Sequence, residues 1–300
     1  MISGALKNPI LVKEIRTRMR GNRAFLLVTA HLLFQSSLVG LIYLIFRTSF
    51  SSFRSYEDQY LFSKLIFGVL VIFDLVMITF IAPALSAGSF SLEKERHTYD
   101  LLRVTVLSEK ALVYGKFAST LSFIFLLLLT SIPMLSPAFM ISGVLVIEIL
   151  ISIAVLSVGA LAFSAIGLFF SSVINRTLLA NVLTYACAVF MMFGIPLLLV
   201  ASAVILQSGN LPRIEQLSPT AVSIWLIIGW CVISLSPLAS LITTEYFLLA
   251  QNNIWWVEVV LNENTTIHMI SPWISHVFIY SLLVLGLIWI TVQRVKYGED

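Results

Sequence analysis

The stretch Leu65–Ala87, LIFGVLVIFDLVMITFIAPALSA, contains one charged residue, Asp74, and is otherwise almost wholly apolar. A helix of about 20 apolar residues crosses the hydrocarbon core of a bilayer. The whole chain has the same character, because 59% of its 300 residues are hydrophobic and only 11% are charged. About a quarter of the residues of a soluble domain are charged. We therefore predict an integral membrane protein and exclude a water-soluble one.

The apolar runs are continuous and do not alternate, so they predict spanning helices and exclude a β-barrel. We expect an all-α membrane protein that forms a single transmembrane domain over residues 1–300. No A-x-A-like cleavage site follows the first run, so we expect a permanent span there and no cleavable signal. The predicted spans are 24–46, 65–87, 117–135, 144–170, 178–206 and 273–292.

Residues 223–242 are also apolar, but Pro237 and several serines interrupt them. Counting this segment as a span gives seven spans, and omitting it gives six. Cytoplasmic segments near spans are enriched in lysine and arginine. With six spans, most of the 18 basic residues lie on one side together with both termini, whereas residues 243–271 carry three glutamates and no lysine or arginine. We therefore favour six spans in a cell membrane, cytoplasmic termini, and an outer re-entrant or interfacial segment at 223–242.

Residues 8–21 predict a short helix before the first span. Asn8 can cap it, and Pro9 suits the first helical position. Leu11, Ile15 and Met19 recur at helical spacing. Charged residues hold the other positions, namely Lys13, Glu14, Arg16 and Arg20. A basic amphipathic helix of this kind is typical of the membrane interface, although a solvated helix beside a span would show the same pattern.

The longest charged segment, 89–116, separates the second and third predicted spans. Its residues Ser91–Arg103, SLEKERHTYDLLR, mix both charge signs with leucines at roughly helical spacing, and Ser108 can cap the helix that follows. We predict a short exposed amphipathic helix near two span ends. A plain solvated hairpin loop, whose charges only fix topology, is the alternative.

Residues Leu85–Lys116, including Glu-Lys-Glu-Arg at 93–96 and Gly115-Lys116, resemble the signature of ABC-2 type transporter permeases. Asn8–Arg16, NPILVKEIR, is similar to the start of such permeases, in which an interfacial elbow helix precedes the first span. The six predicted spans and the irregular segment before the last one also fit. One departure is Val106, where many members carry proline.

The resemblance implies that the loop is a coupling helix that docks on a separate ATP-binding subunit. The implied contact residues are Glu93, Glu95, Arg96, Thr98, Tyr99, Leu101 and Leu102. It further implies an exporter with two ATP-binding subunits, which bind ATP and Mg, and a second permease subunit, identical or homologous. The surroundings would be membrane lipid, and no nucleic-acid partner is expected.

The chain lacks a G-x-x-x-x-G-K-[ST] phosphate-binding loop, so we expect no ATPase activity and no cofactor in this chain. Its four histidines and two cysteines are scattered and predict no metal site.

Asp74 lies in the middle of a predicted span, and His31 and Glu148 lie within spans or at their edges. Ionisable groups at such depth are costly and are candidates for function, so Asp74 is a candidate for the transport pathway. A neighbouring helix that satisfies the carboxyl would explain it equally. Two other functions stay open, an intramembrane enzyme for a lipid-linked substrate and an ATP-independent secondary transporter.

Overall fold

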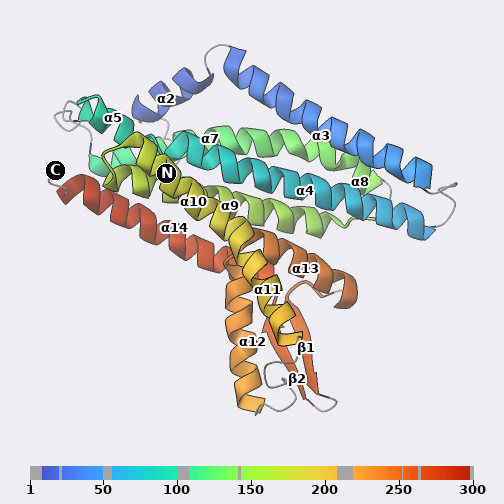
Figure 1. Ribbon diagram of the computed structural model, residues 1–300. Coiled ribbons are helices and arrows are strands. Elements are labelled where there is room, and N and C mark those ends of the chain that lie inside the picture. The colour runs from blue at the N-terminus through green and yellow to red at the C-terminus, as the bar shows by residue number, and fades with distance from the viewer. Residues whose placement is uncertain are drawn as a thin grey trace. The chain divides into compact units, whose positions relative to one another are not determined.

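The computed structural model describes residues 9–19, 22–49, 56–99, 108–140, 143–207, 219–251, 253–262 and 265–297. Helices dominate it, as predicted (Figure 1). Its elements are α2 (Pro9–Met19), α3 (Asn22–Ser49), α4 (Tyr56–Ser86), α5 (Ser91–Glu95), α7 (Glu109–Ser131), η1 (Ile132–Leu135), α8 (Ser136–Met140), α9 (Val146–Val173), α10 (Thr177–Val189), η2 (Phe190–Gly194), α11 (Ile195–Gln207), α12 (Pro219–Ser234), α13 (Pro237–Gln251), β1 (Trp256–Asn262), β2 (Thr265–Ile270) and α14 (Pro272–Tyr297).

Six helical segments are long and apolar enough to cross a membrane, which confirms the predicted count. They are Ala24–Thr48, Asp58–Glu95, Glu109–Phe139, Val146–Val173, Thr177–Ile205 and Pro272–Tyr297. Each segment overlaps one predicted span, although the second and third begin seven and eight residues earlier than predicted. The fifth contains the π-helical turn η2 between α10 and α11. The chain is therefore an integral membrane protein with about six spans.

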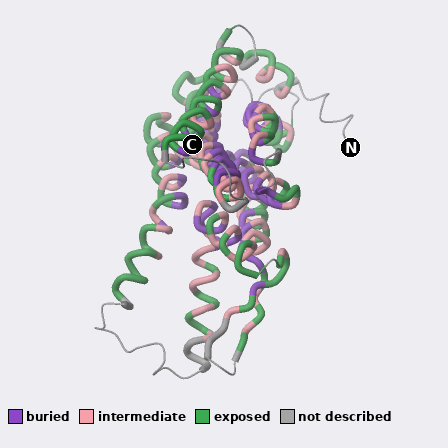
Figure 2. The backbone as a smooth tube through the Cα atoms, turned by 90° about the vertical axis from the view of Figure 1, so that its right-hand side faces the viewer, coloured by how far each residue is buried: buried purple, intermediate pink, exposed green. Residues whose placement is uncertain are grey.

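The described chain divides into two compact units, Met1–Tyr185 with Val284–Asp300, and Ala186–Leu283. The prediction of a single domain stays a prediction, because compactness does not show which parts fold independently. In the first unit, α4, α7 and α9 run side by side, and α3 packs along α4 and α7 (Figure 1). Buried residues gather on these central helices, whereas the outward side of α3 is exposed (Figure 2).

Small residues allow α4 and α9 to approach closely. Ala160, Ala162 and Ala165 are fully buried on α9. A Cβ atom added to Gly167 would overlap the Oγ of Ser86 and lie 3.1 Å from the backbone nitrogen of Ala87. Small residues at helix contacts are typical of membrane bundles, in which packing and not the hydrophobic effect joins the helices.

The second unit contains the predicted irregular segment before the last span. Helices α12 and α13 are bent by 116° at the break between Ser234 and Pro237, and the bent pair extends to Gln251. The prediction of 223–242 as a bent, non-regular segment is confirmed, although it ended too early. The alternative of a seventh span exists only if this pair is counted as one span.

Side chains of α14 satisfy the backbone at this break. His276 contacts the carbonyl oxygen of Ser234 through Nδ1 at 2.8 Å, and the hydroxyl of Tyr280 donates to the carbonyl of Leu235 at 2.8 Å. Ser236 Oγ accepts from the backbone N–H of Ala239 at 3.3 Å, at the start of α13. A broken helix at membrane depth needs such partners, because lipid supplies none.

A two-stranded antiparallel hairpin, β1 and β2, follows α13 and was not predicted. Its sequence carried a signal, because VEVVLN and TTIHMI are rich in β-branched residues or alternate and are separated by two polar residues. Trp255, just before β1, and Trp256, its first residue, are both exposed. Exposed tryptophans are typical of the membrane interface.

Candidate functional site

The charged loop after α4 forms a shorter helix than we predicted. Helix α5 covers only Ser91–Glu95. It ends at a turn in which His97 adopts a left-handed conformation (φ 53°), and the backbone N–H of Thr98 donates to the carbonyl of Glu93 at 3.0 Å. A non-glycine residue with this φ is uncommon and interrupts a regular helix. The predicted short helix is therefore present as α5, and in the described residues it ends before Arg96.

The start of α5 is attached to α9. The backbone N–H groups of Phe90 and Ser91 donate to the hydroxyl of Ser171, at 2.7 and 3.0 Å. The N-cap residue of α5 is Phe90, whose side chain makes no capping hydrogen bond. The hydroxyl thus satisfies two amides that a helix start leaves open, and it fixes the helix on the end of a neighbouring span.

Lys116 of α7 is the centre of a group that we call the Lys116 cluster, made of Glu14, Ser89, Glu93, Lys116 and Ser119. The ammonium donates to the carbonyl of Ser89 and to Oε1 of Glu93, both at 2.7 Å. It lies 3.6 Å from Oε1 of Glu14, whose other oxygen accepts from Ser119 Oγ at 2.7 Å. Lys116 is 2% exposed. One buried cation therefore joins α2, the loop and α7.

The other side of α5 is attached to the start of α10. Glu95 accepts from the backbone N–H of Thr177 at 2.8 Å and from its hydroxyl at 2.7 Å. Lys94 donates to the carbonyl of Ser172 at 2.9 Å and to the side chain of Asn175 at 3.1 Å. A carboxylate at a helix N-terminus is favourable both as a cap and against the helix dipole.

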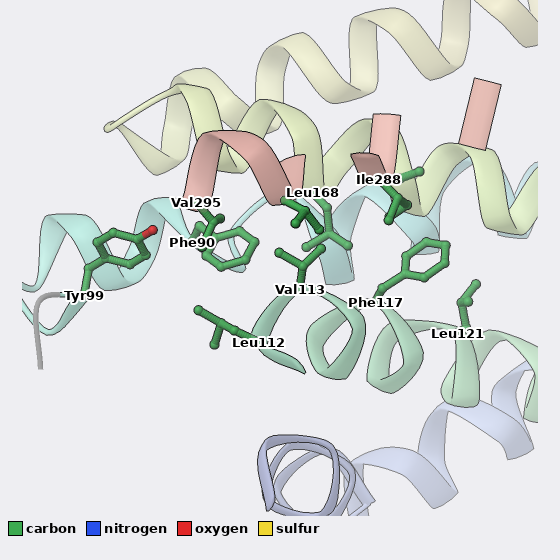
Figure 3. Packing of buried hydrophobic residues seen from close by; sticks show 11 residues of the cluster. Phe90, Tyr99, Leu112, Val113, Phe117, Leu121, Leu168, Ile288 and Val295 are labelled. Carbon is green, nitrogen blue, oxygen red and sulfur yellow. The ribbon is translucent and has the colours of Figure 1, made fainter. Parts of the chain in front are cut away.

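An apolar cluster lies beneath the loop. Phe90 points into the group formed by Val113, Leu168 and Val295 (Figure 3). The ring of Tyr99 packs edge-on against Phe90, with centroids 6.3 Å apart, and is 9% exposed. Together these contacts hold the loop on α7, α9 and the last part of α14.

The implied coupling residues divide into buried and exposed ones. Tyr99 lies in the core of this chain, so its ring offers no surface to a partner in this conformation. Glu93 lies in the Lys116 cluster. Of this set, Glu95, Arg96 and Thr98 are exposed, and so are the neighbouring residues Leu92 and His97. Leu101 and Leu102 lie outside the described residues. The assignment of the set to a partner contact stays a prediction.

The predicted elbow helix exists as α2, which starts at Pro9 and packs against α7. Lys13 and Arg16 are exposed, while Leu11 and Ile15 are half-buried, so the helix is amphipathic as predicted. Glu14 faces inward to the Lys116 cluster. Arg20 lies outside the described residues.

Asp74 is 3% exposed and belongs to a second polar group, which we call the Asp74 cluster, made of His31, Gln35, Asp74 and Ser131. Its Oδ1 atom accepts from Gln35 Nε2 at 2.8 Å and from Ser131 Oγ at 3.0 Å, and it lies 3.4 Å from His31 Nε2. Sequence analysis selected Asp74 and His31 but missed Gln35, although it lies one turn from His31. Ser131 carried no signal.

Glu148 does not stand alone at the edge of its span. Its carboxylate forms an ion pair of 2.5 Å with Lys64, and both side chains are largely buried. It also accepts from the backbone N–H of Leu145 at 3.4 Å, at the start of α9. This pairing explains Glu148 as a structural residue, and the sequence analysis had missed Lys64.

Within the part of the chain that the structure describes, no three histidine, cysteine, aspartate or glutamate side chains gather where they could hold a metal ion. No protein-family model matches the sequence, and no curated protein matches it. The comparisons therefore identify no family.

Proposed function

We propose that this chain is the membrane-spanning permease subunit of an ATP-driven exporter of the ABC-2 type. It would couple ATP hydrolysis by a separate nucleotide-binding subunit to movement of a substrate across the membrane. The resemblance at Leu85–Lys116 and Asn8–Arg16 supports this proposal, as do the six spans and the bent helix pair before the last one.

The anchoring of α5 is the observation that carries the proposal. Polar contacts attach the loop to α7 and α2 through Lys116, to α9 through Ser171, and to α10 through Glu95. A partner that pushes on α5 therefore moves several helix ends together. A free hairpin loop, whose charges only set topology, would need none of these contacts.

The exposed edge of α5 is the proposed docking surface. Leu92 is 40% exposed, and Arg96 is exposed beside it. An open groove of about 620 Å³ adjoins Glu95 and is lined further by Thr177, Leu178, Asn181, Val182 and Tyr185. An apolar side chain flanked by charged ones can both bind and orient a soluble partner.

In the assembly that we propose, two ATP-binding subunits bind ATP and Mg and act on two permease subunits, identical or homologous. The complex lies in the cell membrane with both termini in the cytoplasm. The concentration of basic residues around α2, α5 and the end of α14 supports that orientation.

The docking surface can be tested by tagging the full chain, purifying it from its own cells in mild detergent, and measuring Mg-ATP hydrolysis in the purified material. We expect hydrolysis that is lost with Arg96→Glu, with Leu92→Ala, and with the double change Leu101→Ala and Leu102→Ala. Arg47→Glu, the same charge reversal at the exposed far end of α3, is the matched control and should keep it. Undiminished hydrolysis in all three docking variants contradicts the assignment.

The orientation can be tested with a membrane-impermeant maleimide on intact cells. Cys187 and Cys231 are first replaced by alanine, and a single cysteine is then introduced as Thr98→Cys or Thr266→Cys, both at exposed positions. We expect labelling of the Thr266 variant in intact cells and of the Thr98 variant only after permeabilisation. The reverse pattern would place the loop outside, out of reach of ATP.

The two alternative functions make different demands. A secondary transporter moves substrate in liposomes that contain this chain alone, whereas an ATP-driven permease does not. An intramembrane enzyme needs several acid–base groups at one depth. Among the described residues, His31 and Asp74 meet near the middle of the spans, whereas the pairs Lys64–Glu148 and Lys116–Glu93 lie near span ends.

A further inference from the structure

The side of α3 that packs against the bundle is unusual because half of it is polar. Among the described residues of α3, the buried side chains are His31, Gln35, Ile42 and Phe46. Their spacing of four, seven and four residues makes one seam along the helix. Phe25, Leu33, Leu41 and Leu44 on other sides are more than half exposed, as expected beside lipid. The attachment of α3 to its neighbours thus depends on the Asp74 cluster.

Three helices supply the cluster, with His31 and Gln35 from α3, Asp74 from α4 and Ser131 from α7. His31 Nε2 lies 3.0 Å from Ser131 Oγ, and Ser131 Oγ lies 3.0 Å from Asp74 Oδ1. The hydroxyl therefore links the imidazole to the carboxyl group. His31 Nδ1 and Gln35 Oε1 are buried and have no hydrogen-bond partner among the described residues.

Among the described side chains, no lysine or arginine pairs with Asp74. Among the described residues, its one ion-pair neighbour is His31, which is charged only when protonated. On α4 and α9 the nearest charged groups are Lys64 and Glu148, which pair with each other about 15 Å away along α4. On α7, Lys116 lies about 22 Å from Ser131, with Glu109 and Lys110 farther still. On α3, Arg23 and Arg47 lie about 12 Å and about 24 Å from His31 along the helix.

An isolated carboxylate in the hydrocarbon core is strongly unfavourable. One proton removes that cost. Added to a carboxylate oxygen of Asp74, it forms an O–H bond and a neutral acid beside a neutral imidazole. Held instead by His31, it leaves an imidazolium and a carboxylate in contact. The net charge of the cluster is zero in both arrangements, and it is minus one without the proton.

The cluster borders a small cavity. Its volume is about 10 Å³, and His31 and Asp74 are its polar lining, with apolar side chains such as Ile78, Ile124 and Leu127 around them. That is about the space of one water molecule, and two polar partners suffice to hold one.

We propose that His31, Gln35, Asp74 and Ser131 form a proton-binding site inside the bundle, and that the bound proton keeps α3 against α4 and α7. Release of the proton to water leaves a net negative charge between three apolar helices. The cluster then gains by admitting water, which requires α3 to move outward. The site takes up one proton per chain and needs no other ligand, and the proposal does not depend on an ATP-binding partner.

Infrared spectroscopy of the purified chain in lipid nanodiscs tests the proposal. A protonated carboxyl group has a C=O stretching band that an ionised one lacks, and the band shifts in heavy water. We expect one such band from the folded protein and its loss in Asp74→Asn, which has the shape and neutrality of the protonated acid. Ser131→Ala should keep the band but shift it, because one hydrogen bond to the carboxyl is removed.

Two controls make the result specific. Glu148→Gln removes the other buried carboxyl, which is ion-paired, and Glu258→Gln removes an exposed one, so the band should persist in both. If neither Asp74→Asn nor Ser131→Ala changes the infrared spectrum, Asp74 is ionised in the folded protein. This result overturns the proposal. Thermal stability that rises with Na⁺ in the wild type and not in Asp74→Asn also overturns it, because the site would then hold sodium. Ser131→Ala keeps the test decisive if Asp74→Asn does not fold.

Discussion

The Lys116 cluster and the Asp74 cluster both bind α7 to its neighbours through a buried polar side chain, but they do so in different ways. At Lys116, near the start of α7, a full positive charge meets two carboxylates whose side chains are 22% and 27% exposed. At Ser131, about 22 Å farther along the helix, one carboxyl is surrounded by neutral donors and is 3% exposed.

The difference follows from depth in the membrane. Near the end of a span, charged groups keep some contact with water, so an ion pair costs less to bury. In the middle of a span, bulk water does not reach the side chains. Lysine and arginine are rare there because their charges would lose hydration. The first cluster can therefore be held by charge, whereas the second needs hydrogen bonds and, in our proposal, a proton.

The largest effect should come from Lys116→Met. This change keeps the length of the side chain but leaves Glu14 and Glu93 without their shared cation. Breaking a buried ion pair by removing one partner costs about 3 kcal/mol. Thermal unfolding in nanodiscs measures the loss. Lys110→Met, at the exposed start of the same helix, is the control and should change little.

The same experiment can contradict the claim that charge holds the Lys116 cluster together. If Lys116→Met unfolds like the wild type, the loop is not held by charge. Glu93→Gln should cost clearly less in the Lys116→Met background than in the wild type, because the pair is then already broken. Equal costs in both backgrounds would show that the two residues act independently.

Gly167→Ala should have the next largest effect on stability. It alters an uncharged contact between α4 and α9, which can be compared with the two polar clusters. The added methyl group would overlap the Oγ of Ser86, just before the loop. Overpacking of this kind costs about 2 kcal/mol. Gly159→Ala is a matched control on the same helix, because no atom lies within 4 Å of its added Cβ. Equal unfolding temperatures for the two variants would contradict the close approach of α4 and α9.

Gln35→Met should cost less, about 1 kcal/mol, since it removes one hydrogen bond to Asp74 and keeps the volume of the side chain. Thermal unfolding again measures it. Ser37→Ala, which loses only a bond to its own helix, is the control. If Gln35→Met lowers the stability as much as Lys116→Met does, the hydrogen bonds of the Asp74 cluster are as strong as the ion pairs of the Lys116 cluster. Depth in the membrane would then not explain the difference between the two clusters.

The smallest effect should come from Glu95→Ala. Global unfolding should stay the same, because the carboxylate is exposed and caps only the start of α10. Hydrogen exchange at the amide of Thr177 should become faster, since that amide loses its acceptor. Arg96→Ala, one residue on, should leave this amide protected. Unchanged exchange in the Glu95 variant would remove one of the attachments of α5.

Much of the fold could be predicted from local sequence. Uninterrupted apolar runs determine the spanning helices, because a backbone in lipid must satisfy its own hydrogen bonds. Pro237 marked the bend before the last span, and Ser108 was predicted as a helix cap, which its hydroxyl bond from Ala111 at 3.3 Å confirms. The hairpin was missed because its alternation is short and lies between two strongly apolar segments.

The candidate site was harder to predict, because its contacts join distant parts of the chain. The loop sequence predicted a short exposed helix, yet two of its carboxylates have partners on other helices, since Glu93 binds Lys116 and Glu95 binds Thr177. The resemblance implied a partner contact for Tyr99, and in this structure its ring packs against Phe90. Nothing in the local pattern distinguishes a charge that faces water from one that faces a neighbouring span.

The sequence by itself determined that this chain crosses a membrane about six times and that Asp74 lies at depth, because hydropathy and segment length are local properties. Only the tertiary structure decided which groups meet that carboxyl and that Lys116 joins the loop to α2. Those contacts depend on how helices pack, and packing brings together residues that are far apart in the chain.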